Sequence, residues 1–349
     1  MNISLFSIRI RLLPMNKPVI AVVGATGAVG EEILACLGQR EVSFGSIKLL
    51  ASARSAGRKL PFQGGELTVE ELTEDSFAGV DIALFSVGSD ISKTMGPIAA
   101  AAGSIVIDNS SAFRMDDDVP LVIPEINGSD AMNTPRGIIA NPNCTTIVTL
   151  MALQPFHVAF GGCQRLIAAS YQAVSGSGAE GLAELENQVV AYANKQPIEV
   201  NLYPRQIAFN VIPQVEPILE NGYTKEEMKM QNETRKILHA PDIRASATCV
   251  RVPVFRSHSV AVTAQFANKP DIETARAAIE KAPGIQLVDD REASLYPTPL
   301  DVAHGDDCMV GRIREDLALV NSLAFWVVGD QVRKGAALNA VQIAELLID

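Results

Sequence analysis

The chain contains 349 residues, of which 48% are hydrophobic and 20% are charged. This length exceeds what one hydrophobic core usually organises and predicts about two domains, while the composition excludes a disordered chain. The 40 acidic residues outnumber 29 basic ones and give a net charge of −11, which argues against nucleic acid or a membrane surface as a partner, because both select a basic face.

The first 15 residues, MNISLFSIRIRLLPM, differ from the rest of the chain. Arg9 and Arg11 follow the apolar stretch and no cleavage site is evident, so a signal peptide is not indicated. We expect an unstructured extension, or a mis-called start with Met15 as the initiator. No apolar run approaches the roughly 20 residues needed to span a bilayer. Five widely spaced cysteines without a CxxC pair favour reduced thiols in the cytoplasm and no metal.

From Lys17 to about residue 143, short apolar runs alternate with helical patterns. Such β-α-β alternation predicts a doubly wound parallel sheet of the Rossmann-like α/β class. The expected strands are 18–23, 47–51, 80–87, 104–108 and 137–140, and the expected helices are 29–37 and 95–102.

After Asn141-Pro142-Asn143 the strands become longer and alternate in polarity, which predicts an α+β domain of mainly antiparallel sheet. Its expected strands are 164–174, 245–253, 257–267, 308–313 and 317–328, the last two joined as a hairpin at 314–316, and its expected helices begin near 144, 178 and 224. A final helix, 334–347, is expected to pack on the first domain. The predicted division is 16–143 plus 332–349 for cofactor binding and 144–331 for catalysis and dimerisation.

The first strand leads into Gly24-Ala25-Thr26-Gly27-Ala28-Val29-Gly30, and the helix begins inside this motif. Glycines let the backbone turn sharply and approach a pyrophosphate, which the amides of the helix N-terminus then bind. A tight turn without a ligand is the alternative. A P-loop is excluded, because no GK[ST] follows.

The end of the second strand indicates which dinucleotide binds. An NAD site usually carries an acidic residue there for the ribose 2′-hydroxyl. This chain instead has Arg54 and Ser55 and no carboxylate, and an arginine with a hydroxyl suits a 2′-phosphate. The prediction is NADP(H).

Cys144 follows a strand and begins a helix in the segment NPNCTT. Helix N-termini stabilise a thiolate, and their amides, with Asn143 beside them, could stabilise an oxyanion. Cys144 is therefore a candidate nucleophile, with a small buried hydrophobic residue as the alternative.

Among four histidines, His258 is the candidate base. A lone histidine is more often structural, but Arg251 lies on the preceding apolar strand, where a buried arginine needs an anionic partner.

Eight motifs in order over residues 17–349 together resemble the bacterial aspartate-semialdehyde dehydrogenases. They are GATGAVG, LLASARSAG, DNSSAFR, NPNCTT, SYQAVSGSG, EEMKM, VRVPVFRSHS and RKGAALNAVQIAE. The resemblance implies NADPH-dependent reductive dephosphorylation of 4-phospho-L-aspartate to L-aspartate 4-semialdehyde and phosphate. It places the chain in lysine, diaminopimelate, threonine and methionine biosynthesis, as a homodimer or tetramer.

The resemblance also implies residue roles. Cys144 forms the acyl-thioester, His258 is the acid/base, and Gln172 and Asn143 assist at the catalytic centre. Arg251 binds the substrate α-carboxylate and Glu226 its amino group. Arg114, Asn143 and Lys229 match the phosphate and substrate contacts. The implied cofactor contacts are Gly24, Thr26, Gly27, Ala28, Val29, Arg54, Ser55, Ser175, Gly176 and Gln331.

The sequence departs from the family in two places. It has NCTT where many relatives have NCST, and it has Arg256 at a position that is often small. The charge of Arg256 could alter the pKa of His258.

Other interpretations of single residues remain open. Arg114 could pair with the acidic run 116–118, and Glu226 and Lys229 could form a surface i,i+3 pair. Two alternative functions also remain. One is N-acetyl-glutamyl-phosphate reductase, which has the same chemistry but typically a Gly-Cys-Tyr motif. The other is a non-catalytic NADP-binding regulator whose cysteine is inert or only senses redox state.

Overall fold

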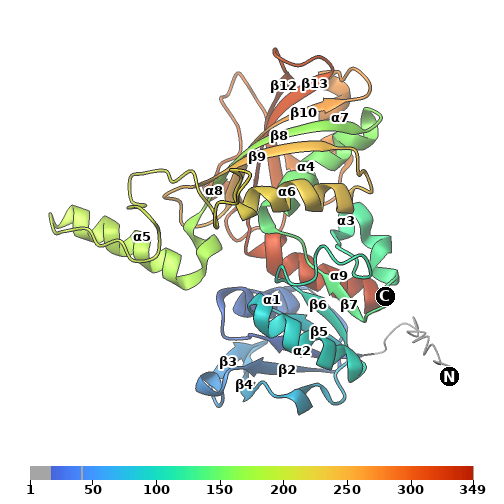
Figure 1. Ribbon diagram of the computed structural model, residues 1–349, viewed down its shortest axis with the longest axis vertical. Helices are drawn as coiled ribbons and strands as arrows, with labels where there is room; N and C mark the ends of the chain where they lie inside the picture. The colour runs from blue at the N-terminus through green and yellow to red at the C-terminus, as the bar shows by residue number, and fades with distance from the viewer. Residues whose placement is uncertain (1–16, 41, 349) are drawn as a thin grey trace. The chain divides into compact units, whose positions relative to one another are not determined.

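A computed structural model describes residues 17–40 and 42–348 (Figure 1). The expectation for residues 1–15 therefore lies outside the described residues. The chain forms two compact units: unit 1 comprises the described residues up to Asn141 and those from Ala340 onward, and unit 2 is Pro142–Asn339. The predicted divisions after residues 143 and 331 lie two and eight residues from these boundaries.

Unit 1 is built on a seven-stranded sheet with the strand order β3-β4-β2-β1-β5-β6-β7. All neighbours pair in parallel except the edge pair β3–β4. Strands β5 and β6 are buried at every position, as expected of parallel strands covered on both faces. The strands are β1 Val19–Val23, β2 Ser46–Ala51, β3 Lys59–Phe62, β4 Gly65–Glu71, β5 Ile82–Phe85, β6 Ile105–Asp108 and β7 Ile138–Ala140. The predicted doubly wound sheet is confirmed.

The helices of unit 1 bury one apolar face, as α1 does with Ile33, Leu34 and Leu37. They are α1 Ala28–Gln39, η1 Ala53–Ser55, η2 Glu74–Phe77, α2 Ser89–Ala101, α3 Pro124–Asn127 and η3 Gly128–Met132. Helix α2 begins six residues before the predicted start at Met95, because its first turns, SDISKT, are polar and carry little apolar periodicity.

The C-terminal segment was predicted to be one continuous α-helix over 334–347, and this prediction is wrong. It forms a π-turn, η5 Arg333–Ala337, followed by α9 Leu338–Ile348. In unit 1, Glu345 forms an ion pair with Arg40 at 2.6 Å, and the Gln342 amide donates to Glu125 at 2.9 Å.

Unit 2 is built on a six-stranded sheet with the order β11-β12-β13-β10-β8-β9. The three central pairs are antiparallel, whereas β8–β9 and β11–β12 are parallel, so the predicted mainly antiparallel domain is confirmed. Helices α4, α6 and α7 pack against one face of the sheet. The strands are β8 Cys163–Gln172, β9 Arg244–Arg251, β10 His258–Phe266, β11 Ile285–Leu287, β12 Cys308–Glu315 and β13 Ser322–Gly329. The helices are α4 Cys144–Ala159, η4 Val174–Ser177, α5 Gly178–Ala193, α6 Lys225–Ile237, α7 Ile272–Lys281 and α8 Pro299–Val302.

The β12–β13 turn differs from the predicted position at 314–316. Strand β12 continues to Glu315, and the connection runs over 316–321. The Asp316 carboxylate accepts the amides of Ala318 and Leu319, each at 2.9 Å, and this Asx turn fixes the later reversal.

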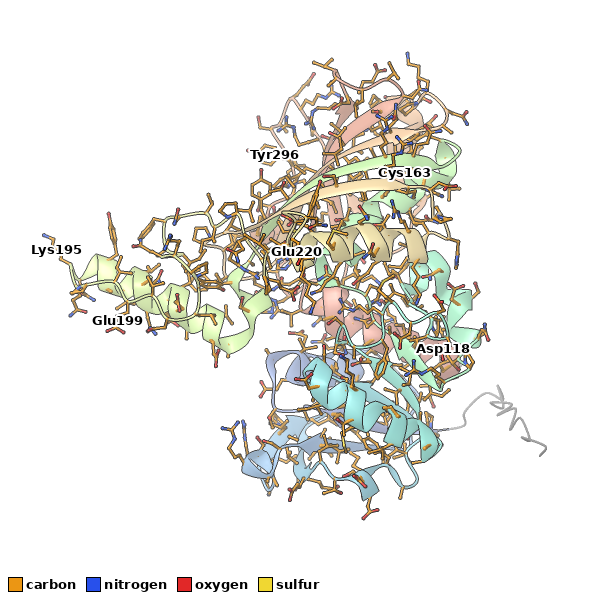
Figure 2. All side chains as sticks on the ribbon, in the orientation of Figure 1. Asp118, Cys163, Lys195, Glu199, Glu220 and Tyr296 are labelled. Carbon is orange, nitrogen blue, oxygen red and sulfur yellow. The ribbon has the colours of Figure 1, made fainter. Side chains whose placement is uncertain are left out.

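Helix α5 and the segment that follows it form an arm that extends away from the sheet of unit 2, with Lys195 and Glu199 near its far end (Figures 1 and 2). The buried Glu184 carboxylate accepts backbone amides of Asn201 and Leu202, and Gln188 Oε1 accepts those of Ile207 and Ala208. These side chains attach the returning segment to α5. Within the described ranges, no helix is both long enough and apolar enough to cross a membrane.

Candidate active site

Cys144 is the first residue of α4, and the preceding residue caps that helix. Asn143 Oδ1 accepts the amides of Thr145 at 3.0 Å and Thr146 at 3.1 Å, which satisfies two amides of the first helical turn. Cys144 is partly exposed, whereas the other four cysteines, all within the described ranges, are buried. The alternative of a small buried hydrophobic residue therefore does not describe Cys144.

Glu226, on α6, connects three predicted site residues. Its Oε1 accepts the amides of Asn143 at 2.9 Å and Gln172 at 3.0 Å, and its Oε2 accepts Lys229 Nζ at 3.0 Å. Burial alone would raise the pKa of Glu226, but Lys229 and the two amides outweigh burial, so the pKa is lowered and the carboxylate stays ionised. Glu226 is 5% exposed and the Lys229 side chain 15%, so their pair is largely buried and not a surface pair.

Gln172 and Glu233 form hydrogen bonds with residues at the start of α4. The Gln172 amide, besides its bond to Glu226, donates to Thr145 Oγ1 at 2.7 Å, so both of its hydrogens are used inside the protein. The buried Glu233 accepts the backbone N–H of Asn143 at 2.7 Å. Glu233 lies seven residues after Glu226 on α6, but no motif in the sequence marks it.

Gly335, in the π-turn η5, also lies against Cys144. A Cβ at position 335 would be 2.9 Å from Cys144 Cβ and 3.3 Å from Cys144 Cα, so only glycine fits without displacement. This contact was not predicted from the sequence. A glycine within a matched motif was the available signal, but its partner is far away in the sequence.

His258, the first residue of β10, is fully buried. Its Nδ1 accepts the backbone N–H of Ala173 at 3.1 Å, and the carbonyl oxygen of the same residue accepts Arg251 Nη1 at 2.7 Å. Burial, reinforced by the charge of Arg251, lowers the pKa of His258 to about 3. The imidazole is therefore neutral at neutral pH.

The glycine turn of unit 1 has the backbone geometry that a dinucleotide needs. Gly24 has φ +84° and a Cβ there would lie 2.3 Å from the Ser86 oxygen, while a Cβ at Gly30 would lie 2.2 Å from the Gly24 oxygen. The N-cap of α1 is Gly27, which has no side chain to accept the first amides. These features fit an anion at the start of α1.

The predicted 2′-phosphate residues follow β2 directly. Arg54 is exposed in η1, and Ser55 Oγ accepts a hydrogen bond from Thr26 Oγ1 at 3.3 Å. The second strand thus ends beside the glycine turn with an arginine and two hydroxyls, and without a carboxylate.

Arg114 of unit 1 is buried and donates to two backbone carbonyls, Asn141 O at 2.9 Å and Asn109 O at 2.8 Å. In the acidic run 116–118, Asp116 and Asp118 form ion pairs with Arg136, at 2.6 Å and 3.2 Å.

Each of the two units is similar in sequence to a known protein family. Residues 19–134 match the family described as "Semialdehyde dehydrogenase, NAD binding domain", and residues 153–334 match "Semialdehyde dehydrogenase, dimerisation domain". The aspartate-semialdehyde dehydrogenase of Bacillus subtilis is 48% identical over 336 residues, covering 94% of this chain and 96% of that protein. The chain belongs to the aspartate-semialdehyde dehydrogenase family. The family and dehydrogenase activity predicted from the sequence motifs are thereby confirmed.

Solved structures of this family agree with the fold. The crystal structure of aspartate semialdehyde dehydrogenase II complexed with ASA from Vibrio cholerae has a TM-score of 0.93 at 45% identity, and covers 96% of this chain and 99% of that chain. The enzyme with NADP from Candida albicans has a TM-score of 0.75 at 26% identity, covering 95% of this chain and 98% of that one.

Arg256, which precedes Ser257 and His258, forms a partly buried ion pair. Arg256 Nε contacts the fully buried Asp330 at 2.6 Å. Next to them, Gln331 Oε1 accepts the amide of Ser257 at 2.8 Å, and the Gln331 amide donates to Ser175 Oγ. Gln331, predicted as a cofactor contact, thus also ties the turn before His258 to the turn that contains Ser175 and Gly176. Whether any of these residues contacts a cofactor stays a prediction.

Proposed function

We propose that this chain uses NADPH to reduce 4-phospho-L-aspartate to L-aspartate 4-semialdehyde, with release of phosphate. The observation that carries this proposal is the partly exposed Cys144 at the start of α4, held by buried polar side chains. The dipole at a helix N-terminus favours a thiolate. That thiolate attacks the acyl carbon and expels phosphate, a good leaving group, to give an acyl-thioester on Cys144.

The amino-acid end of the substrate needs one cation and one anion. We assign its α-carboxylate to Arg251 and its amino group to Glu226, both of which are buried and charged. A buried guanidinium and a buried carboxylate recognise opposite charges strongly, because little water competes there. We assign the phosphate group to Arg114, Asn143 and Lys229. N-acetyl-glutamyl phosphate lacks a free amino group for Glu226, which argues against that substrate.

NADPH supplies the hydride that reduces the thioester. In unit 1 we assign the pyrophosphate to the glycine turn Gly24–Val29 and the 2′-phosphate to Arg54 and Ser55. In unit 2 we assign the nicotinamide end to Ser175, Gly176 and Gln331. The C–S bond then breaks, which releases the aldehyde and restores the Cys144 thiolate. We assign the proton transfer at the oxygen of the thiohemiacetal to His258, as the acid/base.

The reverse reaction tests this proposal. Aspartate semialdehyde, phosphate and NADP⁺ should give NADPH with a large preference over NAD⁺ and over N-acetylglutamate semialdehyde, and omission of phosphate should stop the reaction. Cys144→Ala should abolish turnover and leave NADPH binding nearly intact. A wild-type enzyme that prefers the N-acetylated substrate, or a Cys144→Ala variant that stays active, would contradict the assignment. A Cys144 thiol that is alkylated only near or above about pH 8.5 would favour the regulator.

We further propose that the chain forms a homodimer through the face of the six-stranded sheet opposite α4. Exposed Ile167 and Tyr171 of β8 lie on this face, and the Tyr171 ring contacts Trp326 at 5.5 Å between centroids. A cavity of about 400 Å³ is lined by Trp326 and Tyr296 and offers space for a partner side chain. Ile167→Glu should yield monomers in sedimentation velocity, whereas Ile91→Glu, at a similarly exposed isoleucine of unit 1, should not. An Ile167→Glu variant that remains dimeric would contradict this interface.

A further inference from the structure

A single buried side chain, Asp330, connects the segments that hold Cys144 and His258. Asp330 follows Gly329, the last residue of β13, and Gly329 pairs with His258 at the start of β10. On its other side Asp330 precedes the π-turn η5, which contains Gly335. Asp330 is fully buried. It therefore lies between the strand end beside the proposed acid/base and the turn against the proposed nucleophile.

Asp330 fixes the start of η5. Its Oδ1 accepts the amides of Val332 at 2.9 Å and Arg333 at 3.1 Å, as a capping side chain does at the start of a helix. Its backbone carbonyl accepts the N–H of Gly335 at 3.0 Å, the five-residue spacing of a π-turn. Gly335 lies against Cys144, where a Cβ would be 2.9 Å from Cys144 Cβ. Because the cap sets where η5 begins, it also sets where Gly335 meets the nucleophile.

The second carboxylate oxygen of Asp330 holds the turn that leads into His258. Asp330 Oδ2 accepts Arg256 Nε at 2.6 Å and the N–H of His304 at 2.7 Å. Arg256 directly precedes Ser257, whose backbone forms a hydrogen bond with the His258 ring. A shift of the Arg256 backbone therefore moves a group that is bonded to the imidazole.

The backbone of this turn is strained at Ser257. Ser257 is fully buried and has φ +78°, in the left-handed region that residues with a Cβ rarely adopt. Its N–H donates to Gln331 Oε1 at 2.8 Å, and Gln331 directly follows Asp330. Strained residues persist only where their surroundings hold them, and they are common at active sites. Asp330, through Arg256, and Gln331 hold this turn from two sides.

We propose that Asp330 is a positioning residue of the reaction. Its Oδ1 fixes η5 against Cys144, and its Oδ2 fixes the Arg256–Ser257 turn beside His258, so one carboxylate sets the geometry between the nucleophile and the acid/base. Such geometry matters because a displacement of about 1 Å can cost about 100-fold in rate. Asp330 acts through these segments and not by touching the substrate. The inference rests on the proposed function for the roles of Cys144 and His258.

A second buried aspartate provides a matched control. Asp289 accepts the amides of Arg312 at 2.9 Å and Ile313 at 3.2 Å, and it forms an ion pair with Arg276 at 2.9 Å. These are the same kinds of bonds that Asp330 makes, but they support the irregular part of β12. None of the partners of Asp289 has an assigned role in the reaction.

Asparagine variants of the two aspartates separate positioning from support of the fold. Each variant replaces an accepting oxygen by an NH₂ group that faces donors, so both should lower the thermal midpoint by several degrees. In the reverse assay we expect Asp330→Asn to lower kcat about 10- to 100-fold with the KM for aspartate semialdehyde changed less than about threefold, and Asp289→Asn to keep kcat within about twofold of wild type. Wild-type kcat in Asp330→Asn, or equal losses of kcat in the two variants, would overturn the proposal.

Arg256→Ala tests the second oxygen alone, because the Oδ1 cap of η5 remains. It also tests the proposal if Asp330→Asn does not fold. We expect kcat to fall about tenfold in Arg256→Ala and to stay within about twofold of wild type in the control Arg276→Ala. The double variant Arg256→Ala/Asp330→Asn should lose no more kcat than Asp330→Asn, because both residues act through one ion pair. Unchanged kcat in Arg256→Ala, or losses that multiply in the double variant, would overturn the link from Asp330 to His258.

Alkylation of Cys144 by iodoacetamide at neutral pH, measured on the peptide that contains Cys144, does not depend on turnover. Its rate should change at least about threefold in Asp330→Asn and stay at the wild-type value in Asp289→Asn and Arg256→Ala, because only Asp330 holds η5 against the thiol. An unchanged rate in Asp330→Asn, or an opposite change in Arg256→Ala that reveals an effect of charge alone, would overturn the link to Cys144. Wild type that lacks the proposed activity but shows the expected alkylation rates would refute the proposed function and support the positioning of Cys144 by Asp330.

Discussion

Gly335→Ala is the substitution that probes the positioning of the nucleophile most sharply. Position 335 is in the π-turn η5 and does not have a positive φ, so alanine is not excluded by backbone geometry. In an open helical position this change would stabilise the protein by about 0.5–1 kcal/mol. Here the new Cβ would lie 2.9 Å from Cys144 Cβ and 3.3 Å from Gln331 Cβ, so one of the segments must move.

Overpacking of this kind costs about 1–3 kcal/mol, which outweighs the gain in helix propensity. A shift of Cys144 of about 1 Å can cost about 100-fold in rate. We expect Gly335→Ala to lower the free energy of unfolding by about 1–2 kcal/mol and kcat by about 10- to 100-fold, and to change the alkylation rate of Cys144.

Gly38→Ala is the matched control. Gly38 lies within α1, and a Cβ there would meet the Phe62 ring at an ordinary 3.5 Å. This variant should be as stable as wild type or slightly more stable, with unchanged kcat. Denaturant unfolding, steady-state kinetics and iodoacetamide alkylation measure the three effects. Wild-type kcat and alkylation rate in Gly335→Ala would refute the argument that this contact positions Cys144.

Three further outcomes are expected. Arg54→Ala should raise the KM for NADP⁺ about tenfold and leave the KM for NAD⁺ unchanged. Arg165→Ala, at another exposed arginine, is the control. Equal effects of Arg54→Ala on both cofactors would exclude a contact between Arg54 and the 2′-phosphate. The pKa of His258 is lowered from 6.5 to about 3, so its contribution to stability is complete above pH 6.5 and lost as the pH falls towards 3. The free energy of unfolding should therefore fall by up to about 1.4 kcal/mol for each unit by which the pH is lowered across this window. In His258→Asn the free energy of unfolding should depend less steeply on pH. An unchanged dependence would contradict a neutral buried histidine. The thiols of Cys163 and Cys249 should resist alkylation at neutral pH, because burial raises the pKa of each to about 12, and rapid modification of either would contradict that burial.

Much of the fold was predictable because local patterns matched their final environment. The run PVIAVV became the buried strand β1, and the N-cap Asn143 marked the start of α4. The edge hairpin β3–β4 was missed, because only Val69 of GELTVEE is buried and the segment lacks an apolar run. Sequence patterns describe burial well, but they say little about edge strands.

The site was predictable in its residue types but not in its connections. Asn143 was expected near an oxyanion, yet its side-chain oxygen caps α4 and its amide binds Glu226. The contact between Gly335 and Cys144 joins segments far apart in the chain, and so does the hydrogen bond from the Asn143 N–H to Glu233. No local spacing encodes such contacts, because they arise only when the sheet and its helices are assembled.

A covalent acyl-enzyme on Cys144 is the central claim, and mass spectrometry of acid-quenched enzyme tests it most directly. Enzyme mixed with 4-phospho-L-aspartate in the absence of NADPH should carry one aspartyl group on the peptide that contains Cys144, and NADPH added before quenching should remove it. An enzyme that turns over substrate but never carries that group, or carries it on another residue, would contradict the account.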